Sequence, residues 1–540
     1  MLTGLPEAEP TRTLIDELLA EQQQLTAVER FARQHDEAKL PAQARYYHGL
    51  IPLAKPRPGE QYAFAVDLDL CTGCKACVSA CHSLNGLDDD ETWRSVGLLQ
   101  GGTAVEPYQQ TVTTACHHCL DPACLNGCPV LAYEKDADTG IVRHLDDQCI
   151  GCQYCVLKCP YDVPKYSAKR GIVRKCDMCH GRLAANEAPA CVQACPSGAI
   201  SIQLVSRTEI ERRSSVLNEQ LLPGTFESSY AKPSTTYASR KAHPENSRSV
   251  DTGVLRLEPA HWPLVWMLVL TQTAAGMLLA AWLTALLAAQ SFAVSKGALA
   301  LCGFILLQLG LAASVFHLGR PLGAWRAFLG LRRSWMSREI VAFAFFAIAA
   351  GVFVLSALST TIATADPVLS GIVALLGCVS VFCSAMIYVD TPRTSWIWSL
   401  TFPRFFGTTV LLGAAGAACI LGWAAPLSNT VLAAAWAATA IRTALFVWEA
   451  QLLLRPFHPR SKPRYSAALL AWQCLKPVIV ARIALFVVST CFGLLGIVMS
   501  GSLAVCFATI AFVSTFSSQI IERYCFFVTA AAPRMPGGAG

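Results

Sequence analysis

The residues best suited to chemistry in this chain are its cysteines, because sixteen of the 24 lie between residues 61 and 204. They form four groups of four: Cys71, Cys74, Cys77 and Cys81; Cys116, Cys119, Cys124 and Cys128; Cys149, Cys152, Cys155 and Cys159; Cys176, Cys179, Cys191 and Cys195. The first and third groups have the spacing C-x2-C-x2-C-x3-C, and a proline follows the fourth cysteine in three groups. Each group supplies four thiolates, which are soft metal ligands.

The spacing within the groups favours iron–sulfur clusters. Three cysteines within seven residues can bind three corners of one [4Fe–4S] cube, and the following turn carries the fourth cysteine towards a neighbouring cube. This is the bacterial ferredoxin run, in which the fourth cysteine ligates the other cluster of a pair. The sequence therefore predicts a ferredoxin-like α+β domain with four [4Fe–4S] clusters, whose cysteine groups must be matched two by two.

Structural zinc and disulfides are the alternative uses of these cysteines. CxxC pairs bind zinc in many small domains, but zinc needs paired knuckles rather than triplets. Disulfides are disfavoured because a cytosolic chain is kept reduced. The other eight cysteines, such as Cys302, Cys378 and Cys506, lie in or beside apolar segments without motif spacing. We interpret them as packing residues.

Several polar residues lie beside the cysteines of the groups. His117 and His118 fall inside the second group, where four thiolates leave them no ligand position, so we expect hydrogen-bonding or potential-tuning roles. Lys75, Lys158 and Lys175 would raise the reduction potential by favouring the more negative reduced cluster. Solvation explains these lysines equally well.

The second half of the chain has the composition of a membrane domain. From Trp262 onward, apolar stretches of about 20 residues recur, the length that crosses about 30 Å of hydrocarbon. Hydrophobic residues make up 53% of the whole chain and charged residues 15%, which is too apolar for an average soluble protein. About eight transmembrane helices are predicted, at 263–288, 297–316, 340–361, 367–389, 405–423, 427–448, 482–500 and 502–520.

The basic residues of this half indicate membrane topology. They lie in the loops after the second, fourth and sixth spans: Arg320, Arg326, Arg332, Arg333 and Arg338; Arg393 and Arg404; Arg455, Arg460, Lys462 and Arg464. The net charge of +6 therefore does not indicate a nucleic-acid partner. The positive-inside rule makes these loops and both termini cytoplasmic, and the sequence begins without a signal-peptide pattern. We expect a multi-pass protein of the bacterial inner (cytoplasmic) membrane with its cluster domain on the cytoplasmic side.

The expected partners of the membrane half are membrane lipid and the quinone pool, and the quinone pool can exchange electrons with the clusters. Intramembrane haem needs pairs of axial histidines, and this half contains only His261, His317 and His458, so no haem is expected. His317 closes the second span on the cluster side, and we predict that it takes a proton from quinol; a helix-end hydrogen bond is the alternative role. Arg442 and Glu449, in or at the end of the sixth span, are expected to face the bundle interior or to reach the interface.

Four segments follow from these patterns. Residues 1–60 are predicted to form an amphipathic helix and a connector, and residues 61–204 the four-cluster domain. Residues 205–259 are rich in Ser, Arg, Thr and Pro without periodicity, which indicates a linker or a strap over the domain surface. Residues 260–540 form the predicted all-α membrane anchor with the quinol site.

Within these segments, a few elements can be placed. The apolar spacing predicts one helix over Thr13–His35, with Thr13 and Asp16 capping its start. Alternating apolar residues predict β-strands such as Tyr62–Val66 and Ile200–Leu204 at the two ends of the cluster domain.

Taken together, these motifs resemble the electron-transfer and membrane-anchor subunits of the dimethyl sulfoxide reductase family, fused into one chain. The four cysteine groups, including Cys-His-His-Cys-Leu-Asp-Pro-Ala-Cys at 116–124, are similar to those of the iron–sulfur subunit. Three segments are similar to the anchor subunit: His261-Trp-Pro-Leu, His317-Leu-Gly-Arg-Pro-Leu-Gly-Ala-Trp and Ser337-Arg-Glu-Ile. The resemblance covers about 61–540, whereas the fusion and residues 1–60 depart from the family's separate subunits.

The resemblance implies a function. Anchors of this family oxidise menaquinol to menaquinone, and His317 matches the family histidine associated with that step. The electrons would pass through four [4Fe–4S] clusters to a separate subunit with a molybdenum bis-pterin centre, which reduces an acceptor such as an S-oxide. Two alternatives stay open: the same architecture as a quinone reductase for a formate- or sulfur-compound-oxidising subunit, and a membrane-tethered zinc-binding protein.

The resemblance also implies a nested matching of the cysteine groups. In this arrangement the outer two groups exchange their fourth cysteines, and so do the inner two. The four ligand sets would be Cys71, Cys74, Cys77 and Cys195; Cys176, Cys179, Cys191 and Cys81; Cys116, Cys119, Cys124 and Cys159; Cys149, Cys152, Cys155 and Cys128.

Overall fold

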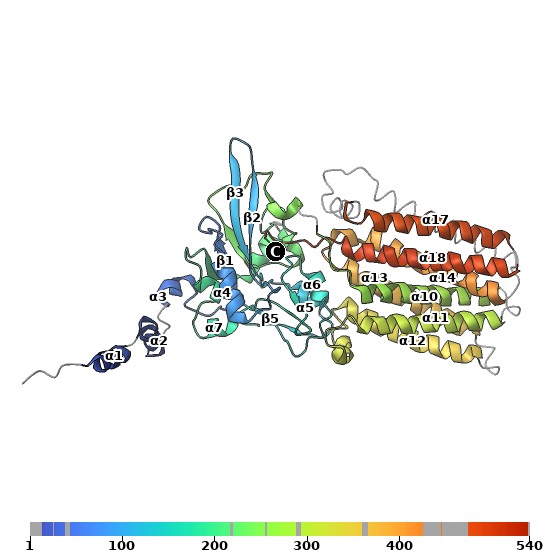
Figure 1. Ribbon diagram of the computed structural model, residues 1–540, viewed down its shortest axis with the longest axis horizontal. Helices are drawn as coiled ribbons and strands as arrows, with labels where there is room; N and C mark the ends of the chain where they lie inside the picture. Colours follow the sequence, from blue (N-terminus) through green and yellow to red (C-terminus); the bar gives the residue numbers. More distant parts are fainter. Residues whose placement is uncertain are drawn as a thin grey trace, which may run out of the picture.

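The computed structural model describes residues 13–24, 26–37, 44–216, 220–253, 256–287, 293–358, 366–424, 444, 473–499 and 501–537. They form two main parts (Figure 1): the cluster domain, made of short strands and helices, and a bundle of long helices that lie side by side. The first two helices lie apart from both. The last residues of the chain return from the bundle to the cluster domain.

A central strand joins the two ends of the cluster domain. Strand β1 (Glu60–Asp67) pairs antiparallel with β8 (Ile200–Ser206) and parallel with β9 (Thr236–Ala238). The strands predicted at the two ends of the domain are thus confirmed, and they pair with each other. Because Val66 lies opposite Ile200 in the register, the first and last cysteine groups emerge at the same end of the sheet.

The remaining strands form one further sheet and two small hairpins. Strand β2 (Ser95–Gly102) pairs with β3 (Pro107–Thr114) and β10 (Arg248–Ser249). The hairpins are β4 (Tyr133–Lys135) with β5 (Val142–His144), and β6 (Lys165–Ser167) with β7 (Ile172–Arg174). Between the strands lie five short helices: α4 (Ala76–Asn85), α5 (Ala123–Gly127), α6 (Tyr154–Lys158), α7 (His180–Ala184) and α8 (Ala190–Gln193).

The prediction of one N-terminal helix was wrong, because the segment forms α1 (Leu14–Gln23) and α2 (Ala27–Glu37). The predicted cap is confirmed, since Thr13 N donates to Asp16 Oδ2 at 2.9 Å and Asp16 N donates to Thr13 Oγ1 at 3.3 Å. A second capping box starts α2: Thr26 N donates to Glu29 Oε2 at 2.7 Å, and Glu29 N to Thr26 Oγ1 at 3.2 Å. This second cap divides the segment.

Two short segments flank the cluster domain. Before β1, helix α3 (Ala44–Tyr47) and the 3-10 turn η1 (His48–Leu50) place the ring of Tyr47 in the domain core. After β8 come α9 (Arg207–Glu211), the π-turn η2 (Arg212–Val216) and the 3-10 turns η3 (Ser228–Tyr230) and η4 (Val250–Gly253). Since β9 and β10 each add a strand to a sheet, this segment runs over the cluster domain.

Within the described residues, seven helices are long and apolar enough to cross a membrane. They are α10 (Trp262–Leu287), α11 (Ala293–Val315), α12 (Trp335–Leu358), α13 (Asp366–Val389), α14 (Trp398–Ala424), α17 (Lys476–Val498) and α18 (Gly501–Val528). The predicted sixth span, 427–448, lies outside the described residues. Helix α12 begins five residues, and α14 seven residues, before the predicted spans at 340 and 405, because the helices continue through polar residues at the membrane surface.

Candidate iron–sulfur and quinol site

Each cysteine group lies where a strand ends and a short helix begins. In the first group, Cys71 and Cys74 follow β1, whereas Cys77 and Cys81 lie on α4. The second and third groups follow β3 and β5 in the same way, and the fourth follows β7. The strand fixes the start of each cysteine loop and the helix holds its end, so the thiols of a group are kept together.

The cysteine loops contain residues in the left-handed region of the backbone. Gly151 has φ 68° and Gln153 has φ 58°, which turns successive amide groups towards the thiols. The amide of Gly151 donates to Cys149 Sγ at 3.4 Å, and the amide of Ala132 donates to Cys128 Sγ at 3.2 Å. Such hydrogen bonds stabilise thiolate ligands.

The thiols of the outer two groups lie close to one another across the chain. Burial raises the pKa of Cys71, and the nearby thiols of Cys77 and Cys195 raise it further. Burial likewise raises the pKa of Cys81 to about 12, with a further contribution from Cys191. The pairing of β1 with β8 accounts for this neighbourhood, because it brings the ends of residues 61–204 together.

The inner two groups are interleaved in the same manner. Burial raises the pKa of Cys119, and Cys116 and Cys159 raise it further. Burial also raises the pKa of Cys152, with a further contribution from Cys128. A small cavity is lined by the four cysteines Cys116, Cys119, Cys124 and Cys159.

The cysteine groups do not form a site for a single metal ion. In the part of the chain that the structure describes, no three His, Cys, Asp or Glu side chains gather closely enough to hold one metal ion. A [4Fe–4S] cube is larger than one ion, so wider spacing of its thiolates is expected.

Two buried cations lie among the thiols. Arg94 is 2% exposed; burial opposes its charge, but the thiol of Cys191 and its neighbours raise its pKa. Lys175 is 3% exposed, and its Nζ lies 3.6 Å from Cys116 Sγ. A buried cation needs a nearby negative charge. Thiolates around an anionic iron–sulfur cluster supply that charge, so the residues present fit such clusters.

The histidines of the second group are buried beside the cysteines. His118 Nδ1 accepts a hydrogen bond from the amide of Val142 at 3.1 Å, which is the kind of role expected for it. The ring of His117 packs edge-on against Tyr161, with ring centroids 4.5 Å apart. Burial lowers the pKa of His117 to about 3, so this ring is neutral at physiological pH.

The three lysines singled out in the sequence have different surroundings. Lys75 is exposed, whereas Lys175 is buried against a thiol, as described above. Lys158 Nζ lies 2.9 Å from the carboxylate of Asp390 and also donates to the Asp390 carbonyl at 2.6 Å. Asp390 follows α13, so Lys158 joins the third cysteine group to the membrane bundle.

His317 lies two residues after the end of α11 and contacts the third cysteine group. Its Nε2 lies 3.2 Å from the carbonyl oxygen of Cys152. A carbonyl only accepts hydrogen bonds, so Nε2 donates and Nδ1 is left as the basic nitrogen. Burial lowers the pKa of His317, and the bond to Cys152 partly opposes this.

A second histidine, not given a role in the sequence analysis, stands beside His317. The ring centroids of His261 and His317 are 5.2 Å apart, and His261 also packs edge-on against Phe527. Burial lowers the pKa of His261 to about 4, and His317 and Arg393 contribute. The sequence motif at 261 was visible, but the two histidines lie at the ends of different helices, so their contact could not be read from it.

The loop after α11 docks directly on the inner cysteine groups. It contains the 3-10 segment η5 (Pro321–Phe328). The amide of Arg320 donates to the Ile150 carbonyl at 3.0 Å, and the amide of Gly330 donates to the Pro129 carbonyl at 2.8 Å. Basic side chains predicted to mark this loop also bind the cluster domain, since Arg320 Nη1 donates to the Asp146 carbonyl at 2.7 Å.

Charged side chains are also buried within the bundle, and the sequence analysis gave them no role. Glu339 on α12 and Glu522 and Arg523 on α18 are at most 6% exposed. Arg523 Nη2 donates to Gln272 Oε1 on α10 at 2.9 Å. The sequence did contain a signal for these three residues. Ionised side chains in apolar spans are costly to place in lipid and usually face the interior of the helix bundle. Arg442 and Glu449, which the sequence analysis did single out, lie outside the described residues.

Two family descriptions match this chain. Residues 108–205 match the family described as "4Fe-4S dicluster domain", and residues 258–528 match "DMSO reductase anchor subunit (DmsC)". The second match covers half of the chain. The second, third and fourth cysteine groups and the helix bundle therefore lie in the two kinds of domain that the sequence predicted, and the first cysteine group precedes the matched residues.

Individual relatives agree with these matches. A chain of the anaerobic dimethyl sulfoxide reductase of Haemophilus influenzae is 40% identical over 150 residues, which are 26% of this chain and 73% of that protein. The "Probable anaerobic dimethyl sulfoxide reductase chain YnfG" of Escherichia coli K12 is 40% identical over 148 residues, 26% of this chain and 72% of that protein. The "Formate dehydrogenase-O iron-sulfur subunit" of the same strain is 33% identical over 171 residues, 28% of this chain and 57% of that protein.

The relatives cover about a quarter of this chain, and the anchor family matches residues 258–528. One chain thus carries both components, joined through residues 205–259. It belongs to the dimethyl sulfoxide reductase family, as an iron–sulfur electron-transfer subunit fused to a DmsC-type membrane anchor.

Proposed function

We propose that this chain oxidises menaquinol at the cluster side of the membrane and delivers the electrons to a separate molybdenum bis-pterin subunit. That subunit would reduce an acceptor such as an S-oxide. Four [4Fe–4S] clusters, each carrying one electron at a time, would connect the two sites. The observation that carries the proposal is the 3.2 Å contact between His317 Nε2 and the Cys152 carbonyl, because it joins the membrane boundary to a cluster loop.

The nested ligand sets are part of this proposal. The closeness of Cys195 to Cys71 and of Cys159 to Cys119 supports them. The proximity of the thiols also supports an order of the four ligand sets by increasing distance from the membrane. Cys128, Cys149, Cys152 and Cys155 share a buried core with the membrane helices, so their set would come first.

The other three sets follow by their contacts. Cys176 lies close to Cys116, which joins the second set to the third. Cys191 lies close to Cys77, which joins the third set to the fourth. The set completed by Cys195 would therefore lie furthest from the membrane and nearest to the catalytic subunit.

His317 is the residue that we propose takes a proton from quinol. Its Nε2–H is held by the Cys152 carbonyl, so the ring is fixed with Nδ1 available to accept from a quinol hydroxyl. The same contact keeps the ring near the cysteine loop that would receive the electrons. Proton and electron would thus leave the quinol towards the same end of the bundle.

The cytoplasmic location of the cluster domain is likewise proposed. The loops after α11 and α13 contain the basic residues that the positive-inside rule counts, and both loops lie against the cluster domain. Arg326 Nη1 donates to the Asp147 carbonyl at 2.8 Å, and Lys158 pairs with Asp390. These contacts support one common side for the basic loops and the clusters, in the inner membrane of a bacterium.

The reverse direction is the second candidate function. It is favoured by the 33% identity to a protein named for formate dehydrogenase. The midpoint potentials of the clusters discriminate between the two directions, because menaquinol oxidation needs a first cluster near or above the menaquinone potential. A first cluster far below that potential would favour quinone reduction instead.

The decisive experiment is anaerobic purification of the chain with its native partner. We expect about sixteen irons and a matching amount of acid-labile sulfide per chain, four per cluster, and molybdenum in a separate co-purifying subunit. About four zinc ions without sulfide would support the zinc-binding alternative and refute the proposal.

A kinetic test addresses the quinol site in the same complex. The His317→Gln variant keeps a hydrogen-bond donor for the Cys152 carbonyl but removes the basic nitrogen. We expect quinol-driven cluster reduction to slow by roughly 100-fold, whereas reduction by a dithionite-reduced viologen, which needs no quinol site, stays at the wild-type rate. Equal quinol-driven rates in the variant and the wild type would refute the role of His317.

A further inference from the structure

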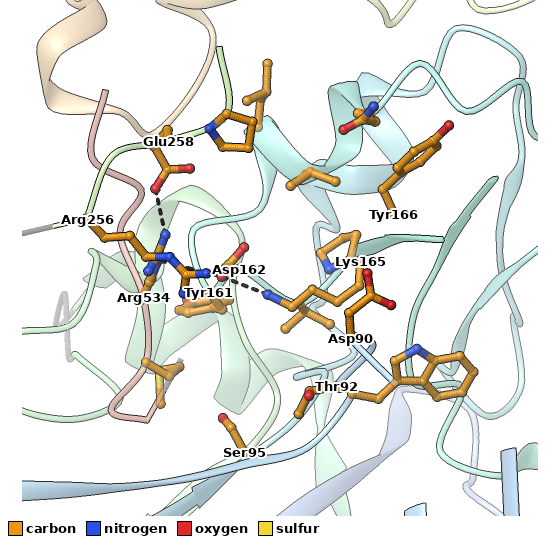
Figure 2. A pocket seen from close by; sticks show the side chains of 18 of the residues that line it. Asp90, Thr92, Ser95, Tyr161, Asp162, Lys165, Tyr166, Arg256, Glu258 and Arg534 are labelled. Carbon is orange, nitrogen blue, oxygen red and sulfur yellow. Dashed lines mark hydrogen bonds and ion pairs between the residues drawn. The ribbon is translucent and has the colours of Figure 1, made fainter. Parts of the chain in front are cut away.

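A cavity of about 320 Å³, lined by polar and apolar residues, lies where the cluster domain meets the segments at the ends of the membrane helices (Figure 2). It is lined by the cluster domain, the residues before α10, the loop between α13 and α14, and the last residues of the chain. Its lining includes His261 and Arg393 and also Asp90, which is exposed. Such a space holds on the order of ten water molecules. It can therefore connect the histidine pair with the surface.

A row of alternating charges follows this cavity. Arg393 Nη1 lies 3.6 Å from Glu258 Oε2, and Glu258 Oε1 lies 2.6 Å from Arg534 Nη2. Arg534 Nε lies 3.6 Å from Asp162 Oδ2, which lies 2.8 Å from Lys165 Nζ. Figure 2 shows the pairs of Glu258 with Arg534 and of Asp162 with Lys165. These five residues come from four different segments of the chain.

Arg393 is the least exposed side chain of this row and Lys165 the most exposed, and Arg534, between the two carboxylates, is 22% exposed. The side chain of Arg393 is 4% exposed and that of Glu258 is 13% exposed. Asp162 is 14% exposed, and Lys165, at the outer end, is 28% exposed. The row thus leads from a buried arginine towards water, and its two carboxylates are almost equally exposed.

Quinol oxidation creates a need for such a route. It breaks two O–H bonds and forms two carbonyls, releasing two protons and two electrons. The electrons would pass one at a time to the clusters, but the clusters do not carry protons to water. Positive charge left at a buried site is costly. The ring of His261 lies 5.2 Å from that of His317 and also lines the cavity, so it joins the proposed quinol site to this space.

We propose that the cavity is the proton exit of the quinol site, with Glu258 and Asp162 as the carboxylates that relay protons from His261 to the surface. The inference rests on the proposed quinol oxidation at His317. Each proton accepted there moves to the neighbouring ring of His261, then through water and the two carboxylates to the surface, where Asp90 is exposed. Arg393, Arg534 and Lys165 are positioning residues that orient the carboxylates.

The test uses the holo complex and menaquinol-driven reduction of the clusters in stopped flow. Glu258→Gln and Asp162→Asn keep the size of each side chain but remove the proton-carrying group. We expect each to slow the reduction at least tenfold and to raise the solvent deuterium isotope effect above the wild-type value. Acetate, a small weak acid that fits the cavity, should restore part of the rate. Viologen-driven reduction reports whether the clusters are intact.

Two further variants separate proton transfer from structure. Glu211→Gln removes an exposed carboxylate that pairs with Lys232 at 2.9 Å, away from the cavity, and should leave all rates at the wild-type value. Arg534→Leu breaks the charge row but keeps both carboxylates. The proposal would be overturned if Arg534→Leu matched Glu258→Gln in isotope effect and acetate response. It would also be overturned if acetate restored no rate in Glu258→Gln and Asp162→Asn. In either case, loss of an ionic contact would explain the result. A wild-type complex that does not react with menaquinol would instead refute the proposed function, and this inference with it.

Discussion

Lys175 is a single side chain that touches two cysteine groups. Its Nζ lies 3.6 Å from Cys116 Sγ and donates to the Cys176 carbonyl at 2.8 Å. Burial opposes its charge, but the thiols of Cys116 and Cys124 outweigh burial and raise its pKa. The ammonium group therefore stays protonated between the second and fourth cysteine groups. A positive charge there favours the reduced, more negative state of a neighbouring cluster.

We expect Lys175→Met to lower the reduction potential of the cluster proposed at Cys116, Cys119, Cys124 and Cys159. A unit charge about 6 Å away at an effective dielectric constant of about 20 corresponds to roughly 100 mV. Redox titration followed by electron paramagnetic resonance measures the shift. Lys75→Met is the matched control, because Lys75 is exposed and solvent screens its charge. An unchanged potential in Lys175→Met would contradict this account.

Gly319 is the closest backbone contact between the membrane loop and the cluster domain. A Cβ at this position would lie 2.2 Å from the Gly171 carbonyl oxygen. Gly151, inside the third cysteine group, is equally confined, since its Cβ would lie 2.3 Å from the same oxygen. Only glycine allows the loop after α11 to approach the cysteines this closely, and His317 lies two residues before it.

Gly319→Ala should therefore push the loop away from the third cysteine group. We expect a destabilisation of about 1–3 kcal/mol and slower quinol-driven cluster reduction, because electron transfer weakens steeply with distance. Thermal unfolding and stopped flow measure the two effects. Gly297→Ala on α11 is the control, since its Cβ would meet only the Ala357 carbonyl oxygen at 3.9 Å. Equal behaviour of the two variants would show that the approach is not tight.

Among the elements, a strand, a cysteine loop and a short helix form a unit that recurs four times. The helices are as short as four or five residues, such as α5, α6 and α8, too short to be stable alone. Their stability must come from packing and from the metal ligands at their ends. The recurring unit explains why cysteine spacing predicted the domain well: the spacing is the part of the unit that chemistry fixes.

Other elements were predictable only in part. The apolar spans follow from length and composition, which are local properties, and seven helices of that kind are found among the described residues. The second cap at Thr26 was present in the sequence but was read as part of one helix. The contact of His261 with His317 and the return of the chain end to the cluster domain depend on tertiary packing, which no local pattern records.

The cap of α2 gives a prediction at this scale. Hydrogen bonds from the backbone and the hydroxyl of Thr26 lower the pKa of Glu29. A carboxylate with a lowered pKa contributes stability above its unfolded pKa, and this contribution is lost as the pH falls through the folded value. In the full chain at pH 7, Thr26→Ala should speed amide hydrogen exchange in α2 by roughly fivefold. In the wild type, the same protection against exchange should be lost in acid.

The matched comparison is α1, whose own cap at Thr13 remains intact in that variant. Exchange in α1, corrected for the intrinsic effect of pH, should be the same in Thr26→Ala and in the wild type. If α1 and α2 lost protection together, the two helices would behave as one unit, and the division at Thr26 would not reflect separate capping.

At the scale of the whole molecule, the cluster domain and the bundle are joined by more than the covalent linker. The loop after α11 binds backbone carbonyls of the inner cysteine groups, and Lys158 binds Asp390. The end of the chain also returns to the cluster domain (Figure 1), where Met535 is 2% exposed in a core with Leu99 and Val112. These contacts come from sites far apart in the sequence, so none of them depends on residues 205–259 being intact.

Cutting the linker should therefore leave the two parts together. Residues Arg240–His243 are exposed, and a protease site inserted after Lys241 would separate the cluster domain covalently from the bundle. We expect the fragment ending there to stay with sedimented membranes in 1 M NaCl, because hydrogen bonds to carbonyls, glycine contacts and the buried Met535 resist salt better than surface ion pairs do. The same cut in a chain that ends at Thr529 should release more of the fragment, since the returning segment is gone. Release from the full-length chain at low salt would mean that the linker, not the interface, holds the clusters at the membrane. Retention would instead explain how a fused chain can carry two components that match separate families, because their interface would already be sufficient without the peptide that joins them.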